Sequence, residues 1–299
     1  MQKVSVITTV LNEVQTIDDL MKSILNQKRK PDEVIVVDGG SLDGTWEKLL
    51  KWKKRFEKKG IKFKAIREEG ANIARGRNIA IKNATCELIA SIDGGCIAEE
   101  NWLEELLKNY KPNFVVSGNF KPLARTFQEK VQGVFVKVSS VDNPSSRSVL
   151  FEKKAWEEVG GYPEHLYTGE DTLFNFKLKK AGYKFVFAKD AMVYWKMRKN
   201  LIRWLLQYYK YGVGDGEALN INLSTNYGKK ILLLIFGFYI FLFFCIRFPK
   251  VFFLIFLPTL CYSLKKSFSI YGIVGGILLP FRYLLFILGF HVGLFRRIK

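Results

Sequence analysis

This 299-residue sequence has few histidines, and its cysteines form no metal-binding pattern. It contains two histidines, His165 and His291, and four cysteines whose spacing fits no metal site. A metal centre built on several imidazoles or thiolates is therefore excluded, and the thiols are expected to be reduced. Any bound metal would have to be a hard cation held by oxygen atoms, which means Mg²⁺ or Mn²⁺.

Acidic side chains are absent from the end of the chain. No Asp or Glu follows Glu217, whereas ten Lys or Arg do, and they contribute about half of the net charge of +19. These charges separate apolar runs and form no basic stripe with interleaved aromatics, so the pattern favours anionic membrane lipids over a nucleic acid as partner. The apolar runs carry no intramembrane acid, which argues against a transporter.

Long apolar runs fill this acid-free tail, over residues 231–246, 251–264 and 270–295. At about 1.5 Å per residue the first run is roughly 24 Å long, shorter than a ~30 Å hydrocarbon core, although flanking basic residues can snorkel. We expect a helical anchor of two or three segments that crosses the cell membrane more than once. The alternative is a buried helical subdomain of a water-soluble protein.

The residues between the runs predict how they are connected. Residues 247–250 (R-F-P-K) are typical of a turn, so the first two runs are expected to form a hairpin. The lysine pairs at 229–230 and 265–266 would then lie on one side, which the positive-inside bias makes cytoplasmic, together with the preceding domain. Pro280 and Arg282 interrupt the third run, which leaves a third span, a re-entrant segment and an interfacial helix open.

The rest of the chain has the composition of one α/β core. Its length and the 48% hydrophobic content suffice for one sizeable domain with an appendage. We predict a catalytic domain over residues 1–222 and a membrane anchor over residues 223–299. Residues 203–217 are rich in aromatics and glycines, and they predict an acceptor-binding or membrane-interface segment, or an amphipathic helix packed on the sheet. Met1 leads directly into an apolar strand, so no cleavable signal peptide is expected.

Polar residues follow each of three predicted strands: Asn12 and Glu13 after residues 3–10, Asp38 after residues 34–37, and Asp93 after residues 87–92. Open α/β sheets bind ligands at the carboxyl ends of their strands, where the strand order reverses. Asp38 can accept hydrogen bonds from a base or a ribose, and the glycines behind it allow the backbone to approach a ligand. Ordinary turn chemistry is the alternative for the sequence Asp-Gly-Gly-Ser.

An acidic pair begins a further predicted element. Glu170 and Asp171 precede an amphipathic segment at residues 173–181, where acids are favoured by the helix dipole. Helix capping alone is the alternative explanation for this pair, and also for Asp93.

Six motifs occur along the chain in a definite order: T-V-L-N-E, V-D-G-G-S-L-D-G-T, A-R-G-R-N-I-A, I-D-G-G-C, S-S-R-S-V-L-F-E-K-K-A-W-E-E-V-G-G-Y-P and G-E-D-T-L-F. In this order they resemble the family 2 glycosyltransferases of the GT-A fold, over about residues 3–217. Several spaced motifs are far more specific than any one of them. The resemblance implies a Rossmann-like, mixed but mainly parallel sheet flanked by helices, followed here by a C-terminal helical membrane segment.

The resemblance also implies a role for each polar site. Asp171 would deprotonate an acceptor hydroxyl with Glu170 as its partner, and Asp93 would anchor Mn²⁺ or Mg²⁺ at the donor phosphates. Nucleotide recognition would fall on residues of the first three motifs: Thr9, Asn12, Glu13, Asp38 and Arg77, with Arg75 as the alternative to Arg77. A lone arginine on a helix is otherwise a solvated charge.

This sequence departs from the family pattern at the metal motif. Asp-x-Asp is usual there, whereas Gly95 occupies the third position here. Asp93 would then bind the cation alone or with the help of water.

The sequence therefore predicts an enzyme that transfers a sugar, with inversion, from a UDP- or GDP-sugar to a hydroxyl of a membrane or lipid-linked glycan. Inversion follows because a single base opposite the leaving group implies one in-line displacement. Polyprenyl phosphate is an alternative acceptor, which would bring its own anionic nucleophile. A non-catalytic membrane protein that binds nucleotide sugars is the second alternative, because Gly95 replaces an acid.

Overall fold

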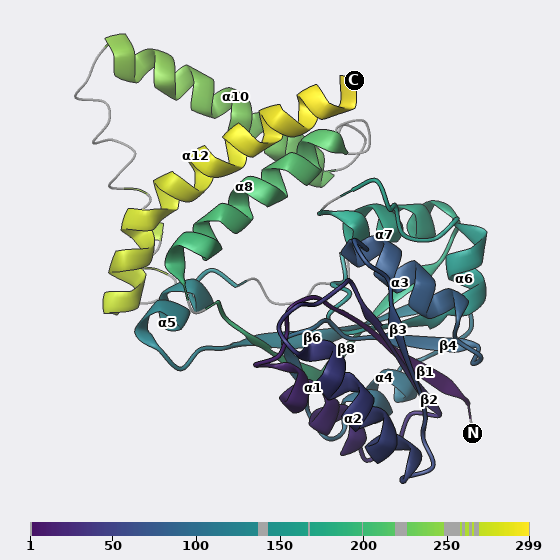
Figure 1. Cartoon of the computed structure of the whole chain (residues 1–299). Helices are drawn as coiled ribbons and strands as arrows, with labels where there is room; N and C mark the ends of the chain where they lie inside the picture. The colour runs from purple at the N-terminus through teal and green to yellow at the C-terminus, as the bar shows by residue number, and fades with distance from the viewer. Residues whose placement is uncertain are drawn as a thin grey trace. The chain divides into compact units, whose positions relative to one another are not determined.

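The computed structural model describes residues 2–136, 143–166, 168–198, 200–218, 226–247, 258, 261–262, 265 and 269–298. The chain divides into two compact units (Figure 1). The sheet unit comprises Met1–Pro122, Lys137–His165 and Glu170–Lys196. The helical unit comprises Leu123–Val136, Leu166–Gly169 and Met197–Lys299.

The sheet unit is built on an eight-stranded mixed sheet with the order β3-β2-β1-β4-β7-β6-β8-β5. Strands β1 to β4 pair in parallel, and β7 pairs antiparallel with both β4 and β6. The strands are β1 (Val4–Val10), β2 (Glu33–Asp38), β3 (Lys62–Arg67), β4 (Leu88–Ser91), β5 (Cys96–Ala98), β6 (Phe114–Leu123), β7 (Val149–Glu152) and β8 (Lys184–Lys196). The central strands are buried on both faces, which explains why they are continuous apolar runs.

Helices cover both faces of this sheet (Figure 1). α3 (Ile73–Lys82), α6 (Lys153–Glu158) and α7 (Glu170–Lys180) lie on one face and share a hydrophobic core with the strands. α1 (Ile17–Leu25), α2 (Thr45–Glu57) and α4 (Trp102–Lys108) lie on the other. In α1 the apolar positions recur at helical spacing and are all buried: Ile17, Leu20, Met21 and Ile24. The predicted Rossmann-like, mixed sheet flanked by helices is therefore confirmed.

The strand order places a topological switch point between β1 and β4. From β1 the chain adds β2 and β3 on one side and then returns to add β4 on the other. Loops that follow β1 and β4 diverge at such a point and leave a crevice at the carboxyl edge of the sheet. The residues that follow these two strands, Glu13 and Asp93 among them, are therefore positioned at the usual ligand-binding edge.

The helical unit contains α5 (Phe127–Gly133), α8 (Leu201–Glu217), α10 (Asn226–Arg247) and α12 (Ile270–Ile298). α8 and α12 pack with their backbones in close contact. A Cβ atom on Gly212 or Gly216 of α8 would collide with α12 backbone atoms, and one on Gly289 or Gly293 of α12 would collide with α8 backbone atoms. Each helix thus contributes two glycines spaced four residues apart, a pattern that lets helices approach closely.

The α8 segment packs on α12 within the helical unit. One expectation for this region needs correction. The third apolar run forms one continuous helix with Pro280 inside it, so it is neither interrupted nor re-entrant. Buried contacts on both sides of Pro280 hold the helix together: Leu279 packs with Trp204 and Phe135, and Phe290 packs with residues of α10.

The first apolar run forms α10, and the second, at residues 251–264, falls almost entirely outside the described residues. The predicted turn at residues 248–250 and the domain boundary at residues 222–223 also lie outside them. Among the described helices, one is long and apolar enough to cross a membrane, the Ile270–Arg296 part of α12. The predicted number of membrane crossings stays a prediction.

Candidate functional site

A buried arginine on α3 joins two of the predicted acidic residues. Arg77 is 2% exposed, and its guanidinium donates to Asp93 Oδ1 at 2.6 Å and to Glu170 Oε1 at 2.7 Å. The solvated-charge alternative for Arg77 is therefore wrong. Asp93 follows β4 and Glu170 begins α7. The Arg77 side chain therefore fixes the loop after β4 relative to the start of α7.

Tyr162 covers one face of this guanidinium. The Arg77 Cζ atom lies 5.3 Å from the ring centroid, and the ring stacks on Phe174 at 4.1 Å. Asn78, next to Arg77 on α3, holds the Tyr162 backbone by accepting from its N–H at 2.9 Å and donating to its carbonyl at 2.8 Å. Burial raises the pKa of the Tyr162 hydroxyl, which stays protonated and lies 3.2 Å from the Ser146 hydroxyl.

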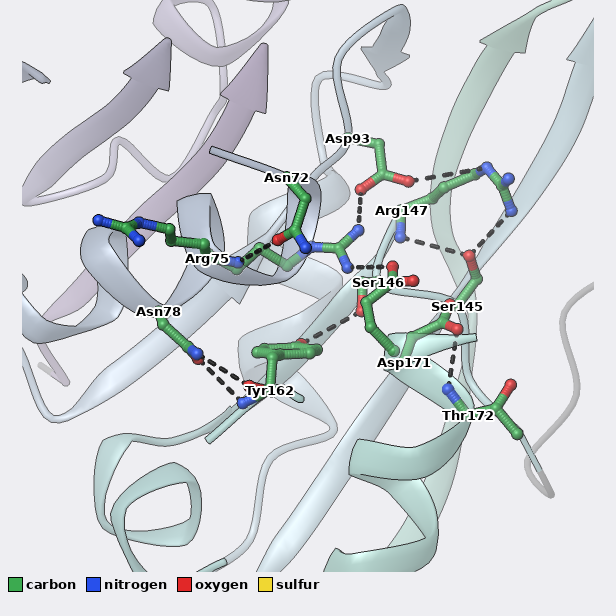
Figure 2. Close-up of polar contacts among 12 residues, drawn as sticks. Asn72, Arg75, Asn78, Asp93, Ser145, Ser146, Arg147, Tyr162, Asp171 and Thr172 are labelled. Atoms are coloured by element: carbon green, nitrogen blue, oxygen red, sulfur yellow. Dashed lines mark hydrogen bonds and ion pairs between the residues drawn. The ribbon is translucent and has the colours of Figure 1, made fainter. Parts of the chain in front are cut away.

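A second arginine faces Asp93 from the other side (Figure 2). The Arg147 Nε atom lies 3.9 Å from Asp93 Oδ2, which is beyond hydrogen-bonding distance. The Arg147 guanidinium stacks over Trp195, with Cζ 3.9 Å from the ring centroid, and donates to the Ser145 hydroxyl at 2.9 Å. Asp93 therefore lies between two cations, but only Arg77 binds it closely.

Asp93 is followed by a strand and not by a helix. The next element is β5, which begins at Cys96, and the Cys96 N–H donates to the Asp93 carbonyl at 3.3 Å. The helix-capping alternative for Asp93 is therefore wrong. Glu170 and Asp171 do lie in the first turn of α7, where acids are favoured. The ion pair of Glu170 with Arg77 goes beyond a capping role.

The Glu170 carboxyl is buried beside another acid. Burial, and then the negative charge of Asp171, raise the pKa of Glu170, while Arg77 opposes this shift. Asp171 is less buried, and its Oδ1 accepts the Thr172 N–H at 2.8 Å. The buried partner is thus tied to Arg77, and the more accessible acid of the pair is Asp171.

Asp38 is completely buried at the end of β2. Its Oδ1 accepts the Ser41 N–H at 2.9 Å and the Ser41 hydroxyl at 2.6 Å. Its Oδ2 has no hydrogen-bond partner among the described residues. Hydrogen bonds within the turn therefore account for Oδ1. Oδ2 is a buried acceptor that a donor group of a ligand would satisfy.

Asn12 connects the loops after β1 and β2. It has a φ of 55°, in the left-handed region that asparagine tolerates better than most residues. Its N–H donates to the Ser41 hydroxyl at 2.8 Å, and its Oδ1 accepts the Leu42 N–H at 3.0 Å. The Asn12 side-chain oxygen is therefore already hydrogen-bonded within the protein.

Glu13 lies beside the glycine that replaces the second acid of the metal motif. A Cβ atom on Gly95 would lie 3.8 Å from Glu13 Oε2, and one on Gly94 would lie 3.6 Å from Glu13 Cγ. Burial, and then the charges of Asp93 and Glu13 among nearby groups, raise the pKa of the Cys96 thiol. The Glu13 carboxylate, from the loop after β1, therefore lies beside the position at which Gly95 replaces the second acid of the motif.

The two remaining predicted residues differ in their surroundings. Thr9 lies in β1 against α3, where a Cβ on Gly76 would come within 2.7 Å of its Cγ2. Arg75 is 53% exposed, pairs with Glu68 and points away from Asp93 (Figure 2). The structure thus brings together Arg77, Asp93, Glu170 and Asp171, and it leaves Arg75 outside this cluster.

The sequence patterns give no role to Arg147, Tyr162 or Asn78. Arg147 and Tyr162 lie in the quoted motif S-S-R-S…G-G-Y-P, and Asn78 lies in A-R-G-R-N, so the motifs contained the signal. Their functions depend on side-chain contacts across the fold, which no local pattern reveals. Within the described residues there is no cluster of three or more His, Cys, Asp or Glu that could hold a metal, and metal binding stays a prediction.

The fold and this edge of the sheet define a GT-A-type protein, and sequence comparison identifies its family. The chain belongs to glycosyl transferase family 2, whose family model matches residues 5–156. The model of glycosyl transferase family group 2 matches residues 136–294.

Curated relatives agree with this assignment. Glycosyltransferase AglE of Haloferax volcanii is 30% identical over 202 residues, which are 63% of this chain and 65% of that protein. Poly-beta-1,6-N-acetyl-D-glucosamine synthase of Staphylococcus epidermidis is 24% identical over 251 residues, 78% of this chain and 59% of that protein. The chain thus matches between about half and two thirds of the length of these relatives.

Solved structures show the same fold. The mannosyltransferase PcManGT of Pyrobaculum calidifontis, in complex with GDP-Man and Mn²⁺, superposes with a TM-score of 0.62 at 17% identity, covering 99% of this chain and 87% of that one. TarS of S. aureus in complex with UDP-GlcNAc superposes with a TM-score of 0.53 at 20% identity, covering 67% of this chain and 60% of that one.

Proposed function

We propose that the sheet unit transfers a sugar from a nucleoside-diphosphate sugar to an acceptor hydroxyl, with inversion. The observation that carries this proposal is the bridge from Arg77 to Asp93 and Glu170. A displacement needs one group at the leaving phosphate and another at the nucleophile, held at a definite separation. Arg77 supplies that separation, and we assign it as a positioning residue because two of its nitrogens already bind carboxylates.

UDP or GDP is the proposed nucleotide. The unpartnered Asp38 Oδ2 supports this, because a base N–H or a ribose hydroxyl would satisfy it. TarS with UDP-GlcNAc and PcManGT with GDP-Man are structural relatives that bind such donors. Thr9 and Asn12 at the same edge remain proposed contributors, with Asn12 acting by holding the Asp38 loop. Arg75 would contact the nucleotide only from its exposed position.

Mn²⁺ or Mg²⁺ is the proposed metal, and the residues present fit it. The Arg147 Nε atom lies 3.9 Å from Asp93 Oδ2, beyond hydrogen-bonding distance, and the Glu13 carboxylate lies beside Gly95. With Glu170 and Asp171, these acids outnumber the two guanidinium groups, so negative charge is in excess. We propose that Asp93 and Glu13 would hold the cation, which supplies charge neutralisation at the leaving diphosphate.

This metal assignment can be tested by Mn²⁺ titration monitored by electron paramagnetic resonance, in the presence of UDP. Asp93→Ala and Glu13→Gln should each weaken Mn²⁺ binding by about tenfold or more. Adding Gly95→Asp to the Glu13→Gln variant should restore binding, because it returns a second carboxylate to the motif. Wild-type Mn²⁺ affinity in Glu13→Gln would remove Glu13 from the site.

Asp171 is the proposed general base. It is the more accessible acid of the pair that begins α7, and Glu170 connects it to the Arg77 bridge. Asp171→Asn should lower kcat by about 10² or more with nearly unchanged donor affinity, because a base acts mainly in the transition state. Asp190→Asn, at an exposed position of β8, is the matched control and should retain activity.

The same experiment separates the alternatives. Near-normal turnover of Asp171→Asn would favour a polyprenyl phosphate acceptor, whose phosphate needs no base. UDP or GDP release that depends on Mn²⁺ supports the enzyme, whereas donor binding without turnover on any membrane acceptor would support the non-catalytic binder. The Glu13 carboxylate beside Gly95 favours the enzyme, because the missing motif acid need not mean a missing metal ligand.

A membrane or lipid-linked glycan is the proposed acceptor, and the cytoplasmic face of the cell membrane the proposed location. α10 and α12 both expose large apolar side chains at helical spacing. On α10 these are Leu233, Phe236, Ile240 and Phe243, and on α12 they are Ile273, Ile277, Phe281, Leu284 and Leu288. Such faces are typical of contact with lipid. The full chain should therefore co-sediment with membranes, and its recovery in the soluble fraction would contradict this location.

A further inference from the structure

A second arginine with buried nitrogen atoms lies in the helical unit, on α12. The Arg282 guanidinium carbon lies 4.5 Å from the ring centroid of Phe135. It lies 4.9 and 3.9 Å from the ring centroids of Trp204 and Tyr208 on α8. Aromatic rings from two separate segments therefore surround one cation.

The nitrogen atoms of this guanidinium lack acceptors. Nε and Nη1 are buried without a hydrogen-bond partner among the described residues. The helical unit offers three acids: Glu129 accepts backbone N–H groups at the start of α5, Asp215 is buried on α8, and Glu217 pairs with Arg296. No acid follows Glu217 in the sequence. Within the described part of the chain, no carboxylate forms an ion pair with Arg282.

Aromatic rings and hydrogen-bond acceptors satisfy different parts of a guanidinium. Rings stack on its flat faces, where the cation–π attraction acts. Its N–H groups point outward in the plane and still need oxygen acceptors. A buried cation also needs a counter-charge, because burial without one is unfavourable. A phosphate group supplies both requirements, since two of its oxygens can accept from two guanidinium nitrogens at once.

The surroundings of Arg282 indicate an amphiphilic ligand. Its neighbours Phe281 and Leu284 are 55% and 42% exposed, so a molecule that reaches the arginine also meets an apolar surface. α8, which packs along α12, exposes the cationic side chains of Arg203 and Lys210. A helix with an apolar face on one side and a cationic helix beside it is typical of the membrane interface, where lipid phosphates lie.

We propose that Arg282 binds the phosphate group of a membrane lipid, with Nε and Nη1 donating to its oxygens and with Trp204 and Tyr208 stacked on the guanidinium. The site rests on the proposed membrane attachment of the chain and not on sugar transfer. A polyprenyl phosphate and a phospholipid share the chemistry that this site recognises. Lipid retention, and not turnover, is therefore the appropriate measurement.

Native mass spectrometry of the full-length protein in neutral detergent would test the site, with a polyprenyl phosphate and phosphatidylglycerol added separately. Wild type should retain one lipid per chain. Arg282→Gln should reduce retention by about tenfold or more, and Arg282→Lys should give an intermediate value, because lysine keeps the charge but loses the fork. Arg203→Gln, which removes the same charge from an exposed position of α8, should match wild type.

Each outcome decides the matter. Selective retention of the polyprenyl phosphate would support a site for a lipid carrier, and equal retention of both would support a membrane-docking site. Equal loss in Arg203→Gln and Arg282→Gln would overturn the proposal, because general charge attraction would then explain binding. Inorganic phosphate that competes at the same concentration as the lipids would also overturn it, because the ligand would then be a soluble phosphate.

A folding control keeps the result interpretable. Arg282→Met removes a guanidinium whose buried Nε and Nη1 have no acceptor among the described residues, so its Tm in lipid-free detergent should equal or exceed that of wild type. A clear drop in Tm would mean that the protein itself satisfies Arg282, and this would overturn the proposal. Loss of glycosyl transfer with intact lipid retention would bear on the proposed function alone.

Discussion

Two arginines, one in each unit, have their charge compensated differently. Arg77 in the sheet unit lies 2.6 and 2.7 Å from two carboxylates, whereas Arg282 in the helical unit is surrounded by rings and has no ion pair within the described residues. A guanidinium with partners from its own chain fixes those partners in place. A guanidinium without such partners keeps N–H groups that can donate to a ligand. The same residue type is thus a structural link in one unit and a candidate binding group in the other.

The largest expected effect comes from breaking the link in the sheet unit. Arg77→Met leaves Asp93 and Glu170 close together without a counter-charge, and it should lower the free energy of unfolding by about 3–5 kcal/mol. Urea denaturation of the purified protein would measure this. Arg282→Met is the corresponding change in the helical unit and should show no such loss. Equal losses in both variants would remove the contrast between the two arginines.

A smaller effect should follow from overpacking the helical unit, which is held by close backbone contact. A Cβ on Gly289 would collide with the backbone of Tyr209, so Gly289→Ala should destabilise the unit by about 1–3 kcal/mol. Gly237→Ala on α10 is the control, because nothing lies within 4 Å of its added Cβ. The control should be neutral or stabilising, since alanine favours helix. Thermal unfolding followed by circular dichroism compares the two.

The pH dependence of stability should depend on Glu170, the buried acid of the Arg77 bridge. Glu170 has a folded-state pKa above its ordinary value of 4.5, so the folded state binds more protons than the unfolded state between these two pKa values. Its contribution is fully present below about pH 4.5 and is lost as pH rises through the folded pKa, at up to about 1.4 kcal/mol per pH unit. Glu170→Gln should lack this loss.

Urea denaturation of wild type and Glu170→Gln over a pH series would check this prediction. Wild type should become less stable relative to the variant as pH rises. Parallel stability curves would mean that Glu170 does not titrate differently in the folded and unfolded states.

The smallest effect is expected at Arg75, two residues from Arg77 on the same helix. Its side chain is 53% exposed and pairs with Glu68 at the surface. Exposed ion pairs contribute about 0–1 kcal/mol, so Arg75→Met should change the free energy of unfolding by no more than that. A loss as large as that of Arg77→Met would show that burial is not what distinguishes the two arginines.

Local patterns predicted much of the sheet unit. The apolar strands and the acids behind them identified Asp38 and Asp93, because a strand and the turn that follows it are encoded by adjacent residues. The structure adds what is encoded far apart. Arg77 and Glu170 are separated by 93 positions, and no pattern of neighbouring residues predicts such a pairing. Glu13 and Gly95 likewise meet only because β1 and β4 are neighbours in the sheet.

The helical unit was less predictable. Pro280 and Arg282 suggested an interruption in the third apolar run, yet α12 continues through both. A proline removes one backbone hydrogen bond, but packing on either side outweighs that loss. Residues 203–217 are rich in glycine, but only the packing of α12 against Gly212 and Gly216 explains why.

By itself the sequence determined the family, three of the central strands, and which acids end them, because each depends on residues that are close along the chain. Only the tertiary structure decided that Arg77 ties Asp93 to Glu170, that Glu13 stands beside Gly95, and that Arg282 is enclosed by rings without an ion pair among the described residues. These facts depend on which distant segments become neighbours when apolar surfaces are buried. Side-chain charge is then compensated, or left uncompensated, by the groups that burial brings together.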